Sequence, residues 1–100
     1  MYKFKETKQA LSDWEKIRSM TKSTKAKWKY LFQDILDAPR EKNTVGNPEE
    51  LKHTDIEMWS RELTKKDRIV YGIEPGTNYD MPEEDEIVVF YQYLQHYKDK

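Results

Sequence analysis

Seven polar residues from position 49 onward are of the types that could together cleave an RNA strand. Cleavage requires a base that takes the proton of the 2′-hydroxyl, a cation that stabilises the charge developing on the phosphate, and an acid that protonates the departing 5′-oxygen. A carboxylate, an arginine and an imidazole can fill these roles, and the planar guanidinium suits the second because it contacts two phosphate oxygens at once. The seven residues are Glu49, Glu50, Lys52, Arg61, Arg68, His96 and Tyr97.

Each of these residues also has an ordinary structural explanation. His96 could be a packed or exposed imidazole, the two arginines could be surface charges of a hairpin, and Glu49 lies in a polar segment. A metal site is not expected, because the chain has no cysteine and its two histidines, His53 and His96, share no recognisable ligand spacing. No cofactor is expected either.

Hydrophobic periodicity predicts a short strand followed by two helices. The segment MYKFKE alternates apolar and charged residues, as a half-buried strand does. From about Thr7 apolar residues recur at helical spacing, and Ser23 or Thr24 is predicted to cap a second helix that ends before Pro39. The apolar stripes that must pack against another element are Ala10, Leu11, Trp14 and Ile17 in the first helix and Trp28, Leu31, Phe32, Ile35 and Leu36 in the second.

The second half of the chain predicts three strands. MWSREL and RIVYGI flank the connection TKKD, which is typical of a β-hairpin, and EIVVFYQYL is apolar enough for a central strand. The order β-α-α-β-β-β indicates one α+β domain over residues 1–100, with an antiparallel sheet and both helices packed on one of its faces. The other face of the sheet would then be open.

The predicted hairpin assigns residues to these two faces, because cross-strand partners point to the same face. With residues 64–67 as the loop, Leu63 pairs with Arg68 and Arg61 pairs with Val70. Arg61 and Arg68 would therefore share the open face. The face toward the helices would carry Met58, Ile69, Tyr71 and Ile73.

Charge is distributed unevenly along a chain whose net charge is only -1. Residues 1–30 carry nine basic and three acidic residues, whereas a later loop contains the acids of residues 80–86. The basic part could bind a polyanion, or it could be the solvated surface of two helices. No apolar run reaches the ~18 residues of a membrane span, and the first residues lack the apolar region of a signal peptide. A cytoplasmic protein without membrane contact is therefore expected.

The segment GNPEELKHTDIEMWSREL-TKKD-RIVYGI, together with the HY pair near the C-terminus, resembles the YoeB/Txe family of bacterial toxins within the RelE superfamily. The resemblance implies a RelE-like, microbial RNase-like fold and a ribosome-dependent mRNA endonuclease that is inhibited by a YefM-type antitoxin. It also allows a homodimer. In this family the position of Glu49 is the general base, that of Arg68 stabilises the phosphate, and that of His96 is the general acid.

The same resemblance places Lys52, Arg61 and Tyr97 at RNA-binding positions. This chain departs from the family pattern at Glu62, where a second arginine is usual, and in its longer acidic loop over residues 74–86. Two alternatives to a nuclease stay open. One is an interaction protein on the same fold, such as the related ParE-type poisons of DNA gyrase, and the other is an inactive toxin that only binds its antitoxin.

Overall fold

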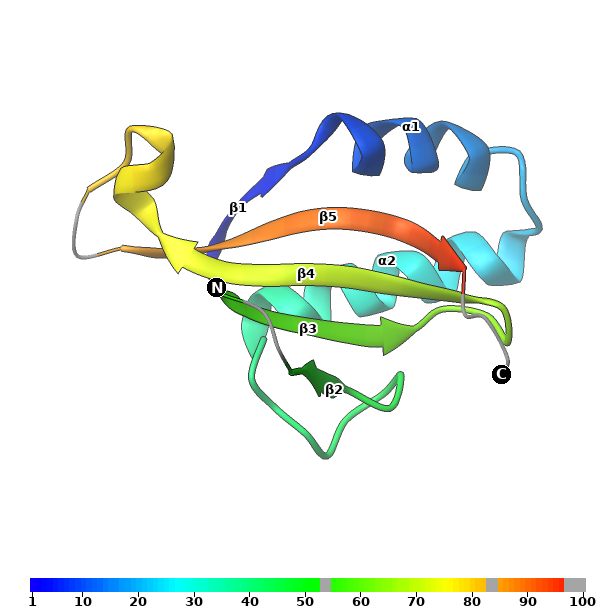
Figure 1. The fold of residues 1–100 in the computed structure, drawn as a ribbon. Coiled ribbons are helices and arrows are strands. Elements are labelled where there is room, and N and C mark those ends of the chain that lie inside the picture. The colour runs from blue at the N-terminus through cyan, green and yellow to red at the C-terminus, as the bar shows by residue number, and fades with distance from the viewer. Residues whose placement is uncertain (53–54, 83–84, 97–100) are drawn as a thin grey trace.

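Two helices and a five-stranded sheet form an α+β structure in two layers (Figure 1). This computed structural model describes residues 1–52, 55–82 and 85–96, and of residue 96 the backbone alone. The sheet has the strand order β1-β5-β4-β3-β2. Along the chain the elements are β1 (Lys3–Glu6), α1 (Lys8–Ile17), α2 (Lys22–Asp37), β2 (Glu49–Leu51), β3 (Glu57–Glu62), β4 (Asp67–Pro75), the 3-10 helix η1 (Gly76–Tyr79) and β5 (Glu86–His96).

The predicted fold class is confirmed, but the sheet is mixed rather than fully antiparallel. β1 runs parallel to β5, with Lys3 opposite Ile87 and Glu6 opposite Phe90, whereas the other neighbouring strands are antiparallel. Two short elements, β2 and η1, lie in segments that were predicted to be loops. Neither is long enough to produce a recognisable hydrophobic period.

The second helix starts at a threonine cap that lies before the predicted one. Thr21 Oγ1 accepts a hydrogen bond from the Thr24 N–H at 3.3 Å, which satisfies one of the donors that a helix start leaves without an intrahelical partner. The cap is therefore Thr21, and the prediction of Ser23 or Thr24 was wrong. The end of the helix agrees with the prediction, because α2 ends at Asp37 and Pro39 disfavours helical geometry in the residue before it.

Both helices cover one face of the sheet and share an apolar core with it. Trp28 of α2 stacks on Trp14 of α1 with ring centroids 4.4 Å apart, and Phe32 of α2 stacks on Phe90 of β5 at 4.8 Å. A large side chain that is fully buried in this core, such as Phe90, contributes about 1.5–3 kcal/mol. Leu11, predicted to face the core, is 49% exposed instead. The buried core consists of Ala10, Ile17, Leu31, Ile35, Leu36, Trp59, Leu63, Ile69, Tyr71, Ile73, Val88, Phe90 and Tyr93.

A buried carboxylate holds η1 against the opposite, open face of the sheet. Glu74 of β4 is only 5% exposed and accepts hydrogen bonds from the hydroxyl groups of Tyr91 and Tyr79 and from the side-chain amide of Asn78. Burial and the neighbouring Glu74 charge raise the pKa of Tyr91, so its phenol keeps the proton that it donates. The acidic loop is thereby fixed at the η1 end of the sheet.

Arg40, which follows α2, connects β3 and β5 at the same end of the sheet. Its Nε and Nη2 atoms donate to Glu57 at 2.8 and 2.9 Å, and its Nη1 and Nη2 atoms donate to Glu86 at 3.1 and 2.8 Å. Hydrogen bonds from Arg40 lower the pKa of Glu57 and also that of Glu86. Arg40 with Glu57 and Glu86, called the Arg40 clamp below, therefore favours the charged form of both carboxylates.

We expect this clamp to make stability depend on pH in the acid range. A carboxylate whose pKa is lower in the folded chain stabilises the fold above its ordinary pKa of 4.5, and this contribution is lost as the pH falls through the folded value. Arg40→Met should therefore lower the free energy of unfolding at neutral pH by about 1 kcal/mol or less, since the groups are partly exposed. It should also make the decrease in stability from about pH 5 to about pH 3 less steep in urea unfolding.

The matched control is Arg18→Met, which removes an exposed pair with Glu15 on α1. It should leave the acid slope of wild-type stability unchanged. An Arg40→Met protein with the wild-type slope would contradict the role of the clamp.

Candidate active site

Arg68, near the start of β4, is fixed on the open face of the sheet. Its Nε atom donates to Ser60 Oγ at 2.8 Å, and its Nη2 atom donates to the carbonyl oxygens of Asn47 at 2.9 Å and Ser60 at 3.2 Å. These three bonds hold the plane of the guanidinium against β3 and against the turn before β2. A guanidinium held in this way is preorganised to bind an anion without first losing side-chain entropy.

The turn before β2 carries the carbonyl group of Asn47 to Arg68. Gly46 has φ +90° and Asn47 has φ +47°, a left-handed region in which glycine and asparagine are the least strained residues. A Cβ atom on Gly46 would lie 2.9 Å from Leu31 Cδ2 and 3.0 Å from Arg61 Cβ, so only glycine fits here. The Glu62 N–H also donates to the Gly46 carbonyl at 2.6 Å. The turn is thus anchored to both α2 and β3.

Glu49, the first residue of β2, lies beside the Arg68 group. It pairs with Ser60 across the β2–β3 ladder, and Ser60 is the residue whose hydroxyl accepts from Arg68. Cross-strand partners share a face, so the exposed Glu49 carboxylate and the guanidinium flank the same serine. The structure therefore brings together a carboxylate and an arginine that were both predicted from the sequence.

The C-terminal part of β5 reaches the same end of the sheet. Gln95 pairs with Arg68, and the backbone of His96 pairs with Asp67, the residue before Arg68. The side chain of His96 and the whole of Tyr97 lie outside the described residues. Their predicted roles are therefore not tested by the structure.

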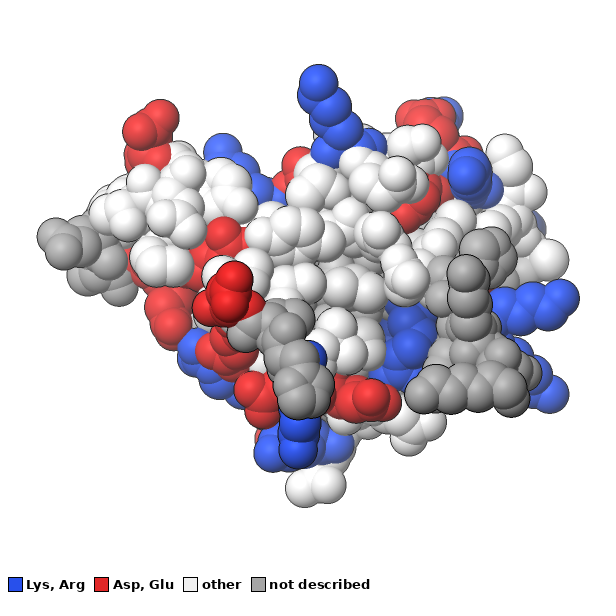
Figure 2. Space-filling view, in the orientation of Figure 1, with Lys and Arg blue, Asp and Glu red and all other residues white. Residues whose placement is uncertain are grey.

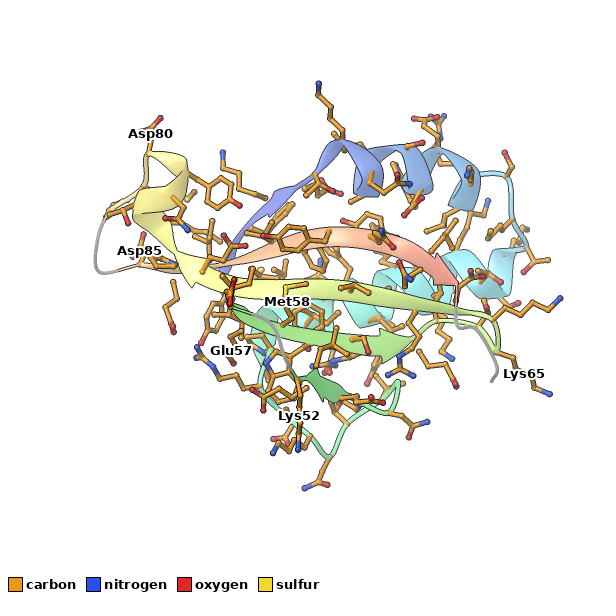
Figure 3. All side chains as sticks on the ribbon, in the orientation of Figure 1. Lys52, Glu57, Met58, Lys65, Asp80 and Asp85 are labelled. Carbon is orange, nitrogen blue, oxygen red and sulfur yellow. The ribbon has the colours of Figure 1, made fainter. Side chains whose placement is uncertain are left out.

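Lys52 is placed further away than the other predicted residues. It is exposed and follows Leu51, which pairs with Met58 of β3, whereas Arg68 lies opposite Glu62 at the far end of the same strand. Figure 3 shows the Lys52 side chain projecting beyond the β2 edge of the sheet. The structure does not bring Lys52 alongside Arg68.

Arg61 does not lie on the open face, so its predicted placement was wrong. It is 0% exposed and faces the helices, where it forms an ion pair with Asp34 and donates to the Ala38 carbonyl at 2.9 Å and to the Tyr71 hydroxyl at 3.4 Å. The Tyr71 hydroxyl in turn donates to the Pro39 carbonyl at 2.8 Å. Arg61 is a structural residue that joins α2, the segment after it and two strands.

The error comes from a one-residue difference in the hairpin register. The Leu63 N–H donates to the Asp67 carbonyl at 2.9 Å, so the loop is shorter than predicted and Glu62, not Leu63, pairs with Arg68. Thr64 Oγ1 organises the loop by accepting from the N–H groups of Lys66 and Asp67. Shifting a strand by one residue moves each side chain to the other face.

The shift also changes which other residues of β3 face the helices. Met58, predicted to face the helices, lies opposite Gly72 on the open face. Trp59 faces the core instead and is 3% exposed. Ile69, Tyr71 and Ile73 of β4 face the helices as predicted. Glu62, directly across from Arg68, places a second carboxylate close to the guanidinium.

Charges are separated along the open face, which is the one turned to the viewer in Figure 2. Acidic groups gather at the η1 end, with Asp80 and Asp85 labelled there in Figure 3, and basic groups gather at the hairpin end, where Lys65 lies. Among the described residues, no group of three or more His, Cys, Asp or Glu side chains could hold a metal ion. In the same part of the chain, no helix is long and apolar enough to span a membrane.

This chain is an α+β protein with its helices on one face of the sheet and an arginine and a carboxylate on the other. Comparison with known proteins shows which class has these features. The family described as the YoeB-like toxin of the bacterial type II toxin–antitoxin system matches residues 6–97. The chain belongs to this family. A comparison with curated proteins finds no match.

Three solved structures of similar fold illustrate the likeness. A YoeB/ParE toxin from Agrobacterium tumefaciens is 24% identical with a TM-score of 0.73, and the match covers 95% of this chain and 99% of that one. A YoeB dimer from Staphylococcus aureus is 21% identical with a TM-score of 0.69, over 96% and 98% of the two chains. A heterotetrameric YoeB–YefM complex from the same species is 21% identical with a TM-score of 0.68, over 97% and 99%.

We expect Arg61 to be required for the fold, because its fully buried guanidinium bonds the Asp34 carboxylate, the Ala38 carbonyl and the Tyr71 hydroxyl, and these groups would lose that buried donor. Arg61→Met should lower the free energy of unfolding by about 3–5 kcal/mol, measured by urea unfolding. Arg18→Met, which breaks an exposed pair, should change it by about 1 kcal/mol or less. Equal effects of the two substitutions would refute the structural role of Arg61.

Proposed function

We propose that this protein is the toxin of a type II toxin–antitoxin pair and acts in the cytoplasm as an endoribonuclease that cleaves mRNA on the ribosome. The observation that carries the proposal is the fixed guanidinium of Arg68 on the open face, held by Ser60 and Asn47 beside the Glu49 carboxylate. Membership of the YoeB-like toxin family supports the same conclusion.

In this proposal three residues divide the chemistry of cleavage. Glu49 takes the proton of the 2′-hydroxyl, and the resulting oxygen nucleophile attacks the adjacent phosphorus. Arg68 binds the phosphate oxygens while negative charge develops on them. His96 donates a proton to the departing 5′-oxygen, which leaves a 2′,3′-cyclic phosphate on one RNA fragment and a 5′-hydroxyl on the other.

RNA contacts near the scissile phosphate are proposed for Tyr97 and Lys52, from the family resemblance. Arg61 has no part in this proposal, because its guanidinium is bonded inside the fold. Glu62 adds a negative charge opposite Arg68, and this charge weakens phosphate binding at the hairpin.

An antitoxin of the YefM type is the proposed inhibitor. The Staphylococcus aureus relative forms a heterotetramer with YefM, and another structure of it is a dimer. The basic residues 1–30 of this chain and the basic hairpin end of the sheet suit an acidic, disordered partner that folds on binding. The acidic η1 end would repel both such a partner and RNA.

Substituting Arg68 tests whether the fixed, planar guanidinium matters more than its charge alone. Arg68→Lys keeps the positive charge but loses the planar group and the bonds that hold it to Ser60 and Asn47, so single-turnover cleavage of ribosome-bound mRNA should fall by roughly 10²–10³-fold. Ribosome binding should change little. Equal losses in binding and cleavage would make Arg68 a docking residue.

Substituting His96 tests the proposed general acid. His96→Ala should reduce cleavage by about 10²–10⁴-fold in a protein with wild-type unfolding behaviour, whereas the control Lys65→Ala in the hairpin loop should retain activity. Full activity in His96→Ala would overturn the assignment. A wild-type protein that binds its antitoxin but cleaves no mRNA would instead be an inactive toxin.

A further inference from the structure

β5 extends past the strand that accompanies it on one side. β1 pairs with residues 87–90 of β5 and ends at Glu6, while β5 continues to His96. Among the described residues, no strand lies beside β5 on this side beyond Phe90, and α1 takes the place of one. The backbone groups on this side must therefore find partners in side chains of α1.

The same part of β5 is irregular on its other side. Between the pairs Tyr71–Phe90 and Val70–Gln92, β5 contains one more residue than β4, and we call this the first bulge. Between Val70–Gln92 and Arg68–Gln95, β5 again contains one more residue than β4, and this is the second bulge. Each extra residue is a bulge that disturbs the ladder and leaves backbone groups without their regular partners. The position of the strand end therefore depends on what holds the two bulges.

One side chain of α1 and the side chain of its N-cap residue bind the bulged backbone of β5. Thr7 Oγ1 donates to the Tyr91 carbonyl at 2.8 Å. Asp13 Oδ2 accepts from the N–H groups of Tyr93 at 3.0 Å and Leu94 at 3.2 Å. Successive N–H groups of a regular strand point to opposite edges, so their convergence on one carboxylate marks the second bulge.

Asp13 occupies a position that helical periodicity would assign to an apolar residue. The buried residues of α1 are Ala10, Asp13 and Ile17, and Asp13 is 3% exposed. Its other oxygen, Oδ1, accepts from the Gln9 side-chain amide at 2.8 Å, so the buried charge is bonded on both sides. A carboxylate is costly to bury, and its bonds to two backbone N–H groups offset that cost.

We propose that Asp13 is a positioning residue of the active site, which holds the second bulge of β5 and thereby sets the register of Gln95 and His96 against β4. The inference rests on the proposed function for the role of His96. Without the bulge, each residue after it would move along β4 by one position, about 3.3 Å, and would turn to the other face of the sheet. The backbone of His96 would then no longer lie opposite Asp67, the residue before Arg68.

Asp13→Asn is the substitution that tests this inference. Both backbone N–H groups donate to the same carboxylate oxygen, so the amide oxygen can still accept both, but without the negative charge these bonds are weaker. Its N–H₂ group would in addition face the side-chain amide of Gln9, which donates to the other oxygen in the wild type. Glu15→Gln is the control, because it makes the same acid-to-amide change on an exposed residue of α1. All measurements are made at a temperature at which both variants and the wild type are folded by thermal unfolding.

Amide exchange and backbone contacts give a readout that does not depend on activity. In Asp13→Asn the Tyr93 and Leu94 amides should exchange at least about tenfold faster than in the wild type, and NMR contacts between Asp67 and His96 should weaken or shift. In Glu15→Gln these signals should stay as in the wild type. Unchanged exchange and unchanged contacts in Asp13→Asn would overturn the inference.

Cleavage kinetics distinguish positioning from simple stabilisation. A small displacement of a reacting group is expected to lower the single-turnover rate by up to about 10²-fold in Asp13→Asn, with ribosome affinity unchanged. Wild-type cleavage by folded Asp13→Asn would overturn the inference even if exchange were faster. If the wild type itself cleaves no RNA, the proposed function fails, and the NMR contacts alone decide whether Asp13 sets the register.

Discussion

The buried guanidinium of Arg61 is the constraint on which the rest of the candidate site depends. It binds Asp34 of α2, the Ala38 carbonyl and the Tyr71 hydroxyl, while its Cβ lies against Gly46. These contacts fix the segment between α2 and β2 on the inner face of β3. The same segment presents the Asn47 carbonyl to Arg68 and leads into β2 at Glu49. The buried charge of Arg61 thus determines how Arg68 and Glu49 are arranged on the open face.

Much of the fold could be predicted because its longer elements have clear periods. The two helices carry apolar stripes of several turns, and the final strand is apolar on both faces, so each was recognised with only small errors at its ends. β1 was recognised as a strand, but its direction was not, since parallel pairing with β5 is a long-range property that local pattern does not contain. β2 has three residues, of which Glu49 and Glu50 are exposed, and is too short and polar to be distinguished from a loop.

The site was predicted in its residue types more accurately than in its geometry. The family resemblance singled out Arg68 and Glu49, and the structure places them around Ser60. The placement of Arg61 was wrong because the hairpin register differs by one residue: Thr64 organises a shorter loop than the four-residue connection TKKD that the sequence predicted. Ser60 was missed although it lies in the segment MWSREL, since a serine next to charged residues gives no indication that it orients an arginine of the neighbouring strand.

The pairing of β1 with β5 has a consequence for how the chain acquires its structure. Thr7 and Tyr91, which are in contact, lie 84 residues apart, and contacts so distant in sequence form late because the intervening chain must first lose much of its freedom. Before β5 inserts between β1 and β4, the apolar surfaces of both helices and of β4 are exposed to water, to proteases and to other unfolded chains. Completing the core and bringing the β5 end to Arg68 are one event, so a chain that is only partly folded cannot present the assembled site.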